Sequence, residues 1–287
     1  MANLKEIRNR ITSIKSTMQI TSAMKMVSAA KLKKAQDAIV AMRPYSSKLT
    51  ELLQNLSATL DSDSGGDYSV QREVNKVLLV VVTSNRGLCG GFNSSITKTV
   101  TRTIAEKYAD KQVDLFAIGK KGGDVLSKTR KVVENRNDIY DDLNFDNVAE
   151  IAEHLMDLYV SGSYDKIELV YNQFKNAATQ LPQVEQFLPI KPIEGGDVNA
   201  NSDYIFEPTK EEIVLALIPK SLKTQLYKAI RDSFASEHGA RMTAMHKATD
   251  NAKDLRDDLL LTYNKARQAA ITNEILEIVG GAEALKN

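Results

Sequence analysis

Apolar residues recur at alternating steps of three and four over the first 60 residues of this 287-residue chain. Thirteen of the seventeen positions on this stripe are apolar, from Leu4 to Leu60. Such spacing is typical of a coiled-coil seam, which packs against a partner helix along its length. The pattern predicts an N-terminal coiled-coil helix over residues 1–60, with a kink or break at Pro44.

The stripe becomes polar at three successive positions, Thr21, Lys25 and Ser28. The apolar residues of this stretch lie off the stripe and are Ile20, Ala23, Met24, Met26 and Val27. Two interpretations stay open. The seam can change face locally, as at a stutter, or this stretch can touch a second partner through a different face.

A second long helix is predicted over residues 207–287, restarting after Pro219 and stopping at Gly280 and Gly281. Residues 240–279 contain neither Gly nor Pro. Steps of three and four select Met245, Ala248, Ala252, Leu255, Leu259, Thr262, Ala266, Ala269, Asn273 and Leu276. Eight of these ten are apolar, and the small ones permit close helix approach. Because both helices join the same central segment, we expect a long antiparallel coiled coil that forms a stalk.

The central residues 73–192 alternate between β-branched runs and helical patterns. The expected strands are 76–84, 112–119, 131–133, 166–174 and 183–188, and the expected helices are 96–109, 122–129 and 147–160. Asn93, Ser94 or Ser95 is the expected N-cap of the first of these helices. Continuous runs such as 76–84 are typical of strands buried on both faces of a parallel sheet. The fold class is therefore α/β, with an open, Rossmann-like central domain between the two coiled-coil helices.

Charge is unevenly distributed along the chain. The formal net charge is +1, yet the first 48 residues hold ten basic and two acidic side chains. Such a segment is attracted to an acidic partner, either nucleic acid or an acidic protein surface. The absence of interleaved aromatic residues weakens the nucleic-acid alternative.

Targeting and redox signals are few. The N-terminus lacks the apolar region of a secretory signal, and no apolar run approaches the roughly 20 residues of a membrane helix. The single cysteine, Cys89, rules out a disulfide within the chain and suits a reducing compartment.

The strongest local candidate for chemistry is the glycine-rich stretch 84–93, SNRGLCGGFN, between a predicted strand and a predicted helix. Such a loop can bind phosphate. Its spacing, G-x-x-G-G, matches neither the dinucleotide fingerprint nor the P-loop. A tight turn that needs glycine and a loop that contacts a partner are the other two interpretations, and no cofactor is predicted.

Side-chain constellations for catalysis or metal binding are weak. Cys89 has no histidine near it in sequence and reads as a small, half-buried hydrophobe rather than a nucleophile. His238 and His246 lie eight residues apart, without the spacing of a zinc-binding helix. Asp141-Asp142 and Asp257-Asp258 are adjacent pairs that point to different faces, so solvated surface is expected.

Specific motifs occur in both terminal helices and in the central domain. The first spans residues 7–31 and includes ITSAMKMVSAAK, and the second is NRGLCGGFN at 85–93. The later ones are SE at 236–237, ARMTAM at 240–245, ATDN at 248–251, YNKARQAAITNEI at 263–275 and EIV at 277–279. Together they resemble, in order and over the whole chain, the gamma subunit of bacterial F-type ATP synthases.

The resemblance implies a rotor shaft with no catalytic site of its own. Gamma subunits place an antiparallel coiled coil inside a hexamer of alpha and beta subunits. Rotation of a membrane c-ring changes nucleotide affinity at the beta sites in turn, and the α/β base docks on the ring with the epsilon subunit. The implied location is the cytoplasmic face of the bacterial inner membrane, as a peripheral protein, with no nucleic-acid partner.

The resemblance also assigns partner-binding residues. Met24 matches a methionine near the centre of the N-terminal helix, opposite Arg241 and the stretch 268–274. Arg267 and Gln268 match positions that hydrogen-bond to beta loops, and the turn at Cys89 matches a loop close to an acidic segment of beta. The complete implied set is Met24, Lys25, Arg86, Cys89, Arg241, Asn264, Arg267, Gln268, Thr272 and Glu274.

Three departures limit the transfer. Lys25 stands where some relatives are acidic, and Cys89 lacks the cysteine pair used for redox control in the plastid form. Residues 195–202 support no assignment of ring or epsilon contacts, although Tyr204 is a candidate. A nucleotide-binding α/β enzyme would need a phosphate loop that is not visible. A coiled-coil adaptor for an acidic partner would leave the motifs of the central domain unexplained.

Overall fold

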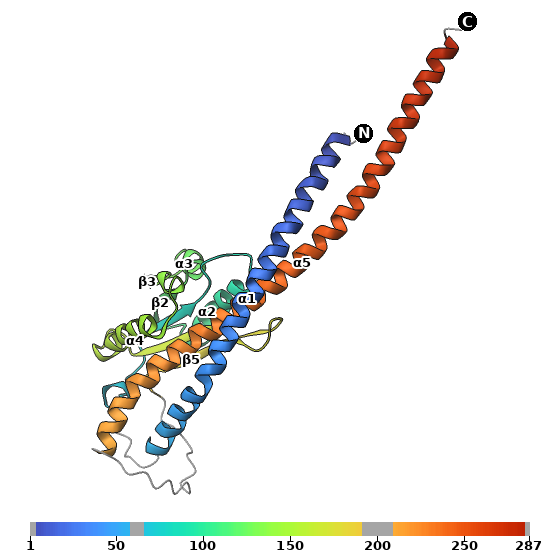
Figure 1. Cartoon of the computed structure of the whole chain (residues 1–287). Coiled ribbons are helices and arrows are strands. Elements are labelled where there is room, and N and C mark those ends of the chain that lie inside the picture. The colour runs from blue at the N-terminus through green and yellow to red at the C-terminus, as the bar shows by residue number, and fades with distance from the viewer. Residues whose placement is uncertain (1–3, 58–65, 191–208, 285–287) are drawn as a thin grey trace. The chain divides into compact units, whose positions relative to one another are not determined.

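The computed structural model describes residues 4–57, 66–190 and 209–284 (Figure 1). They form two compact units, one of Met1–Ser28 with Met242–Asn287 and the other of Ala29–Arg241. The helices α1 (Leu4–Ser57) and α5 (Lys210–Ala284) each contribute to both. The predicted division at 1–60, 73–192 and 207–287 differs from these units because it assigns each long helix to a single domain. It stays a prediction. Its expected irregular segment, 191–208, lies outside the described residues.

The unit Ala29–Arg241 contains a five-stranded sheet in the order β3-β2-β1-β4-β5. The strands are β1 (Lys76–Val82), β2 (Gln112–Ile118), β3 (Val132–Asn135), β4 (Lys166–Phe174) and β5 (Gln180–Leu188). The first four are parallel, and β5 pairs antiparallel with β4. All five expected strands are therefore present, and the α/β class is confirmed.

The helices between the strands are α2 (Phe92–Lys107), α3 (Lys120–Leu126) and α4 (Phe145–Val160). Two short 3-10 turns, η1 (Gly66–Tyr68) and η2 (Asp138–Tyr140), complete the unit. The expected N-cap of α2 is wrong, because the helix begins earlier and Gly91 takes that position without a side-chain cap. Asn93 does not cap the helix, because its Oδ1 accepts a hydrogen bond from the backbone amide of Ser84.

Strand β1 is buried on both faces, as its β-branched sequence predicts. Leu78, Val80 and Val82 pack in a cluster with α4 and with residues 218–230 of α5. Val77, Leu79 and Val81 face the opposite side and pack with α2. The sheet is thus a middle layer between helices, and its core reaches the carboxyl ends of the strands.

In the unit Met1–Ser28 with Met242–Asn287, the N-terminal part of α1 lies beside the C-terminal part of α5 (Figure 1). The Thr249 hydroxyl donates to the Thr21 hydroxyl at 2.8 Å, and Arg256 Nη1 reaches Met18 Sδ at 3.9 Å. Residue numbers fall along α1 as they rise along α5, so the pair is antiparallel as predicted. These contacts lie on the predicted seam of α1.

The seam of α1 continues through its polar stretch. Thr21 is 9% exposed and Ser28 is 2% exposed, whereas Ile20, Met26 and Val27 are exposed. A local change of face is therefore wrong. Small hydroxyl side chains can stay buried here because they form hydrogen bonds within the helix. Ser28 Oγ donates to the Met24 carbonyl oxygen at 2.7 Å. That this stretch contacts a second partner stays a prediction.

The predicted seam of α5 is partly wrong beyond Ala252. Leu259 and Ala266 are sheltered as predicted, whereas Leu255, Thr262 and Ala269 are exposed. The residues after them, Arg256, Tyr263 and Ala270, are sheltered instead. Counting apolar residues missed Arg256 and Tyr263 because such side chains lay their apolar stems along a partner and keep their polar ends in water.

Three expected helix breaks are also wrong. Pro44 lies inside α1, Pro219 lies inside α5, and α5 continues through Gly280 and Gly281 to Ala284. Around the two prolines, tertiary packing outweighs local propensity, because Leu49 and Ile218 belong to the core beside the sheet. No described helix is long and apolar enough to cross a membrane.

Gly119, directly after β2, lies close to the backbone of Thr83, directly after β1. Its φ is +105°, and an added Cβ would lie 2.1 Å from the Thr83 carbonyl oxygen. We expect Gly119→Ala to lower the free energy of unfolding by about 2–5 kcal/mol, from the left-handed backbone and the overpacking together. Urea unfolding measures this. Gly87→Ala is the control, because open space surrounds that position, and an equal loss in both variants would contradict the explanation.

Candidate functional site

The carboxyl ends of β1 and β4 form the switch point of the sheet. From β1 the chain continues to β2 and β3 on one side, and it later adds β4 on the other. In open α/β sheets, ligands bind in the crevice at such a point. The glycine-rich stretch 84–93, the strongest candidate from the sequence, follows β1 and therefore lies at this switch point.

Residues of this chain fill that crevice. Asn172 is fully buried at the end of β4, and its Nδ2 donates to the Phe92 carbonyl oxygen at 3.1 Å. The buried Ser236 hydroxyl of α5 donates to the Asn172 carbonyl oxygen at 3.0 Å. A Cβ on Gly239 would lie 3.1 Å from Ala177 Cα, so helix and loop are in close contact. Helix α5 thus takes the place of a ligand, which argues against nucleotide binding here.

The glycine-rich loop is a tight, internally bonded turn. The Ser84 hydroxyl donates to the Arg86 carbonyl oxygen at 2.7 Å, and Asn93 Nδ2 donates to Cys89 Sγ at 3.2 Å. Gly90 has a φ of +58°, a conformation that glycine adopts without steric cost. Of the three interpretations of this loop, the tight turn is the one that its geometry supports directly.

A buried ion pair on α5 is hydrogen-bonded to the backbone of the glycine-rich loop. Arg241 Nη1 lies 2.6 Å from Glu237 Oε1, and each side chain is 9% exposed. Arg241 Nη2 donates to the carbonyl oxygens of Arg86 at 3.1 Å and Gly87 at 3.4 Å. Burial raises the pKa of Glu237, and its pairing with Arg241 opposes that shift. One guanidinium therefore joins the carboxylate of α5 to the backbone of the loop.

His238 lies beside this pair and stays neutral. Burial lowers its pKa to about 3, with further lowering from Arg241 and Lys31. Its Nδ1 is 3.4 Å from Arg241 Nη1 and can accept a hydrogen bond in the matching tautomer. Phe234 packs edge-on against the imidazole at 4.5 Å between ring centroids. A charged imidazole here would repel the guanidinium, so His238 is a structural part of the site.

Cys89 is buried, and burial raises the pKa of its thiol. It packs with Phe92 and Ala240 in a small apolar cluster. Since the thiolate is the reactive form, this thiol is poorly suited to nucleophilic chemistry. The reading of Cys89 as a hydrophobe is supported, although it is more deeply buried than the sequence suggested.

The predicted partner-binding residues divide into two groups. Arg86, Cys89 and Arg241 come together at the glycine-rich loop, where Arg86 is exposed and the other two are buried. The remaining positions belong to the unit Met1–Ser28 with Met242–Asn287, which is called the helical unit below. There Met24 and Lys25 are partly buried, and the exposed members on α5 are Asn264, Arg267, Gln268, Thr272 and Glu274.

Sequence reasoning missed three residues of the site: Leu88, Asn172 and Glu237. The spacing of Glu237 and Arg241, four apart on a helix, is a signal for an ion pair. Nothing in sequence indicated the burial of Asn172 or the backbone conformation of Leu88.

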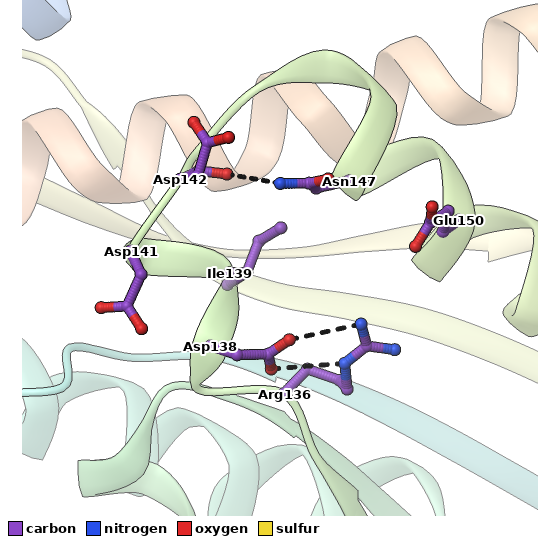
Figure 2. Close-up of a pocket in the computed structure, with 7 residues that line it drawn as sticks. All are labelled: Arg136, Asp138, Ile139, Asp141, Asp142, Asn147 and Glu150. Atoms are coloured by element: carbon purple, nitrogen blue, oxygen red, sulfur yellow. Dashed lines mark hydrogen bonds and ion pairs between the residues drawn. The ribbon is translucent and has the colours of Figure 1, made fainter.

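A separate surface pocket of about 300 Å³ lies between η2 and α4 (Figure 2). Its lining residues are Arg136, Asp138, Ile139, Asp141, Asp142, Asn147 and Glu150. Arg136 pairs with Asp138 at 3.3 Å, whereas Asp141 and Asp142 are exposed, as expected for solvated surface. In the described parts of the chain, no group of three or more His, Cys, Asp or Glu side chains is placed to hold a metal ion.

The neutral state of His238 predicts a pH dependence of stability. The pKa of His238 is about 3 in the folded chain and 6.5 ordinarily. The unfolded chain therefore binds the proton more readily, and the free energy of unfolding decreases as the pH is lowered. We expect this side chain to remove about 2 kcal/mol between pH 7 and pH 5. Denaturant unfolding of the chain and of His238→Gln at both pH values measures it, with Glu237 present in both. The same pH dependence in the variant would refute the assignment.

The ion pair predicts asymmetric effects of single and double substitutions. Arg241→Met leaves Glu237 buried without its partner and is expected to cost about 3–5 kcal/mol in the free energy of unfolding. Arg241→Met combined with Glu237→Leu removes both charges and should recover most of that loss. Chemical denaturation of the two variants compares them, and a double variant less stable than the single one contradicts this account.

Comparisons with known proteins agree with this architecture. A family model described as ATP synthase matches residues 3–285. The ATP synthase gamma chain of Flavobacterium psychrophilum is 74% identical over 286 residues, covering 100% of both chains. That of Cytophaga hutchinsonii is 52% identical over 295 residues, again covering 100% of both.

Solved structures show the same fold. A chain from the central stalk and c-ring of Tetrahymena thermophila mitochondrial ATP synthase has a TM-score of 0.60 and 26% identity, covering 80% of this chain and 99% of that one. A chain from the rotor of Euglena gracilis mitochondrial ATP synthase has a TM-score of 0.69 and 23% identity, covering 93% and 98%. On the full-length match to the family model and to these relatives, this chain belongs to the ATP synthase gamma chain family.

Proposed function

We propose that this chain is the central stalk of an F-type ATP synthase. It couples rotation of a membrane c-ring to ATP synthesis or hydrolysis at the beta subunits and performs no chemistry itself. The observation that carries this function is the antiparallel pairing of the two terminal helices around Thr21–Thr249 and Met18–Arg256. The filled crevice at the end of β1 supports a non-catalytic role.

The exposed side chains of α5 support a partner surface in the helical unit. Apolar residues in its last turns are largely exposed: Ile271, Ile275, Leu276, Ile278 and Val279. Exposed apolar groups near one another are characteristic of a binding surface. Beside them, Arg267, Gln268, Thr272 and Glu274 offer hydrogen-bonding groups to the alpha and beta subunits.

The other partners and the location are part of the same proposal. The epsilon subunit and the c-ring dock on the α/β unit, and the assembly lies on the cytoplasmic face of the bacterial inner membrane. The chain is peripheral there and reaches the membrane through the complex. The net positive N-terminal segment supports an acidic protein partner, and no nucleic acid is involved.

Reconstitution tests the central-stalk function. Matched alpha and beta subunits are mixed with and without the full-length chain, and ATPase turnover and size-exclusion elution are measured. We expect a stable complex with strongly raised turnover, because the chain organises catalytic sites that it does not contain. Separate elution with unchanged turnover would overturn the proposal.

Met24 offers a test of coupling rather than assembly. Met24→Lys adds an ammonium that can pair with a beta carboxylate, and an exposed pair of this kind stabilises one rotary state by up to about 1 kcal/mol. We expect proton pumping per ATP hydrolysed to fall, with assembly kept. Vesicles that contain the whole complex allow both rates to be measured. Equal loss of ATPase rate and pumping would count against this role of Met24.

A further inference from the structure

The helices that connect the strands differ in charge. Residues 92–131, which include α2 and α3, hold nine Lys or Arg and four Asp or Glu. Residues 138–157, which include η2 and α4, hold seven Asp or Glu and neither Lys nor Arg. Side chains of α2 and α3 pack in one apolar cluster on one face of the sheet, and α4 packs on the other face. The connecting helices are therefore basic on one face of the sheet and acidic on the other.

More than half of the basic side chains lie where α2 and α3 end, beside the amino ends of β2 and β3. This group is called the basic edge below and consists of Lys107, Lys111, Lys128, Arg130 and Lys131. All five are exposed. The turn 127–131 contains no acidic side chain, and residues 106–111 contain Glu106 and Asp110. The basic edge thus keeps an excess of positive charge.

The two turns of the basic edge lie side by side. Tyr108, directly after α2, and Leu126, the last residue of α3, are buried in the same apolar cluster as Val113 of β2. Lys107 precedes Tyr108 in the chain, and Lys128 follows closely after Leu126. Strands β2 and β3, which follow the two turns, are neighbours in the sheet. The basic side chains therefore form one surface.

Acidic neighbours neutralise little of this surface. Lys131 Nζ lies 3.8 Å from Asp114 Oδ2, and the Lys131 side chain is still 70% exposed. Among the residues that the structure describes, no ion pair involves the other four side chains of the basic edge. Their positive charge is therefore available to a partner.

The composition of the basic edge favours a lipid surface over a protein as this partner. Protein interfaces are depleted in lysine and enriched in aromatic side chains. Four of the five basic side chains are lysines, and the aromatic residue between two of them, Tyr108, is buried. Clusters of about four to eight basic side chains bind anionic lipid headgroups by electrostatic attraction. A lysine-rich surface of this size fits that kind of partner.

We propose that the basic edge binds the anionic headgroups of membrane lipids. This rests on the proposed function, which puts the α/β unit on the c-ring and therefore beside the membrane. Each basic side chain near an anionic surface strengthens binding about fivefold. The same surface repels the acidic side chains of η2 and α4, so the contact turns the amino ends of β2 and β3 toward the lipid.

The test measures binding of the assembled complex to lipid vesicles. The chain is first assembled with matched alpha and beta subunits, which in the proposed function cover its basic N-terminal helix. Co-sedimentation then compares vesicles of phosphatidylglycerol mixed with phosphatidylcholine and vesicles of phosphatidylcholine alone. We expect binding to the anionic vesicles only, with weaker binding at higher salt because ions screen exposed charges.

Charge removal locates the contact. Lys107→Gln with Lys128→Gln takes one charge from each turn of the basic edge. The matched control, Lys98→Gln with Lys120→Gln, takes the same charge from exposed positions nearer the starts of α2 and α3. Lys98 lies roughly 14 Å from Lys107 along the helix, beyond the screening length of about 10 Å at 0.1 M salt. We expect the first pair to weaken binding to anionic vesicles about tenfold or more and the control to have little effect. Thermal unfolding checks that both variants fold.

The outcomes separate this inference from the proposed function. If the unsubstituted chain does not assemble with alpha and beta subunits, the central-stalk function fails. If the complex forms but does not bind anionic vesicles, or if both pairs of substitutions weaken binding equally, the lipid contact of the basic edge is overturned while the central-stalk function stands. Binding to soluble polyglutamate without binding to anionic vesicles would also overturn it, because the partner would then be an acidic protein.

Discussion

The packing of α5 into the carboxyl end of the sheet is the constraint on which the α/β unit depends. Ser236 and Gly239 meet the end of β4, and the Glu237–Arg241 pair reaches the loop after β1. A single helix therefore satisfies backbone carbonyl groups of β4 and of the loop after β1, which are far apart in sequence. Buried polar groups need such partners, because an unpaired one costs about 1–3 kcal/mol.

This arrangement changes the role of a widespread fold. The switch point of an open α/β sheet is where ligands bind, and here a helix of the same chain replaces the ligand. The glycine-rich loop keeps the tight turn but directs its backbone carbonyls toward Arg241. Because the restraint comes from α5, a change at the exposed tip of the loop is linked to that helix through a buried ion pair.

The helical unit buries small polar side chains in its seam and leaves apolar side chains exposed. Its seam includes buried Thr21 and Ser28, which are small and hydrogen-bonded within the unit. Apolar residues are instead exposed on other faces, such as Ile20 and Val27. A helix pair with part of its apolar surface outside the seam can be surrounded by other protein chains, which is what a central stalk requires.

The sequence by itself determined the α/β class, the strands, the antiparallel helix pair and the stripe of α1. Periodicity and β-branched runs report directly which faces are buried, so strand β1 and the seam from Leu4 onward could be predicted. The helix ends expected at Pro44 and Pro219 were wrong, because packing beside the sheet outweighs local propensity there. Only the tertiary structure decided that Arg241 and Cys89 are buried, that Leu88 is exposed on left-handed backbone, and that α5 fills the crevice. Those outcomes depend on contacts between residues about 150 positions apart in the chain, such as Arg241 with Arg86, and no local pattern encodes such contacts.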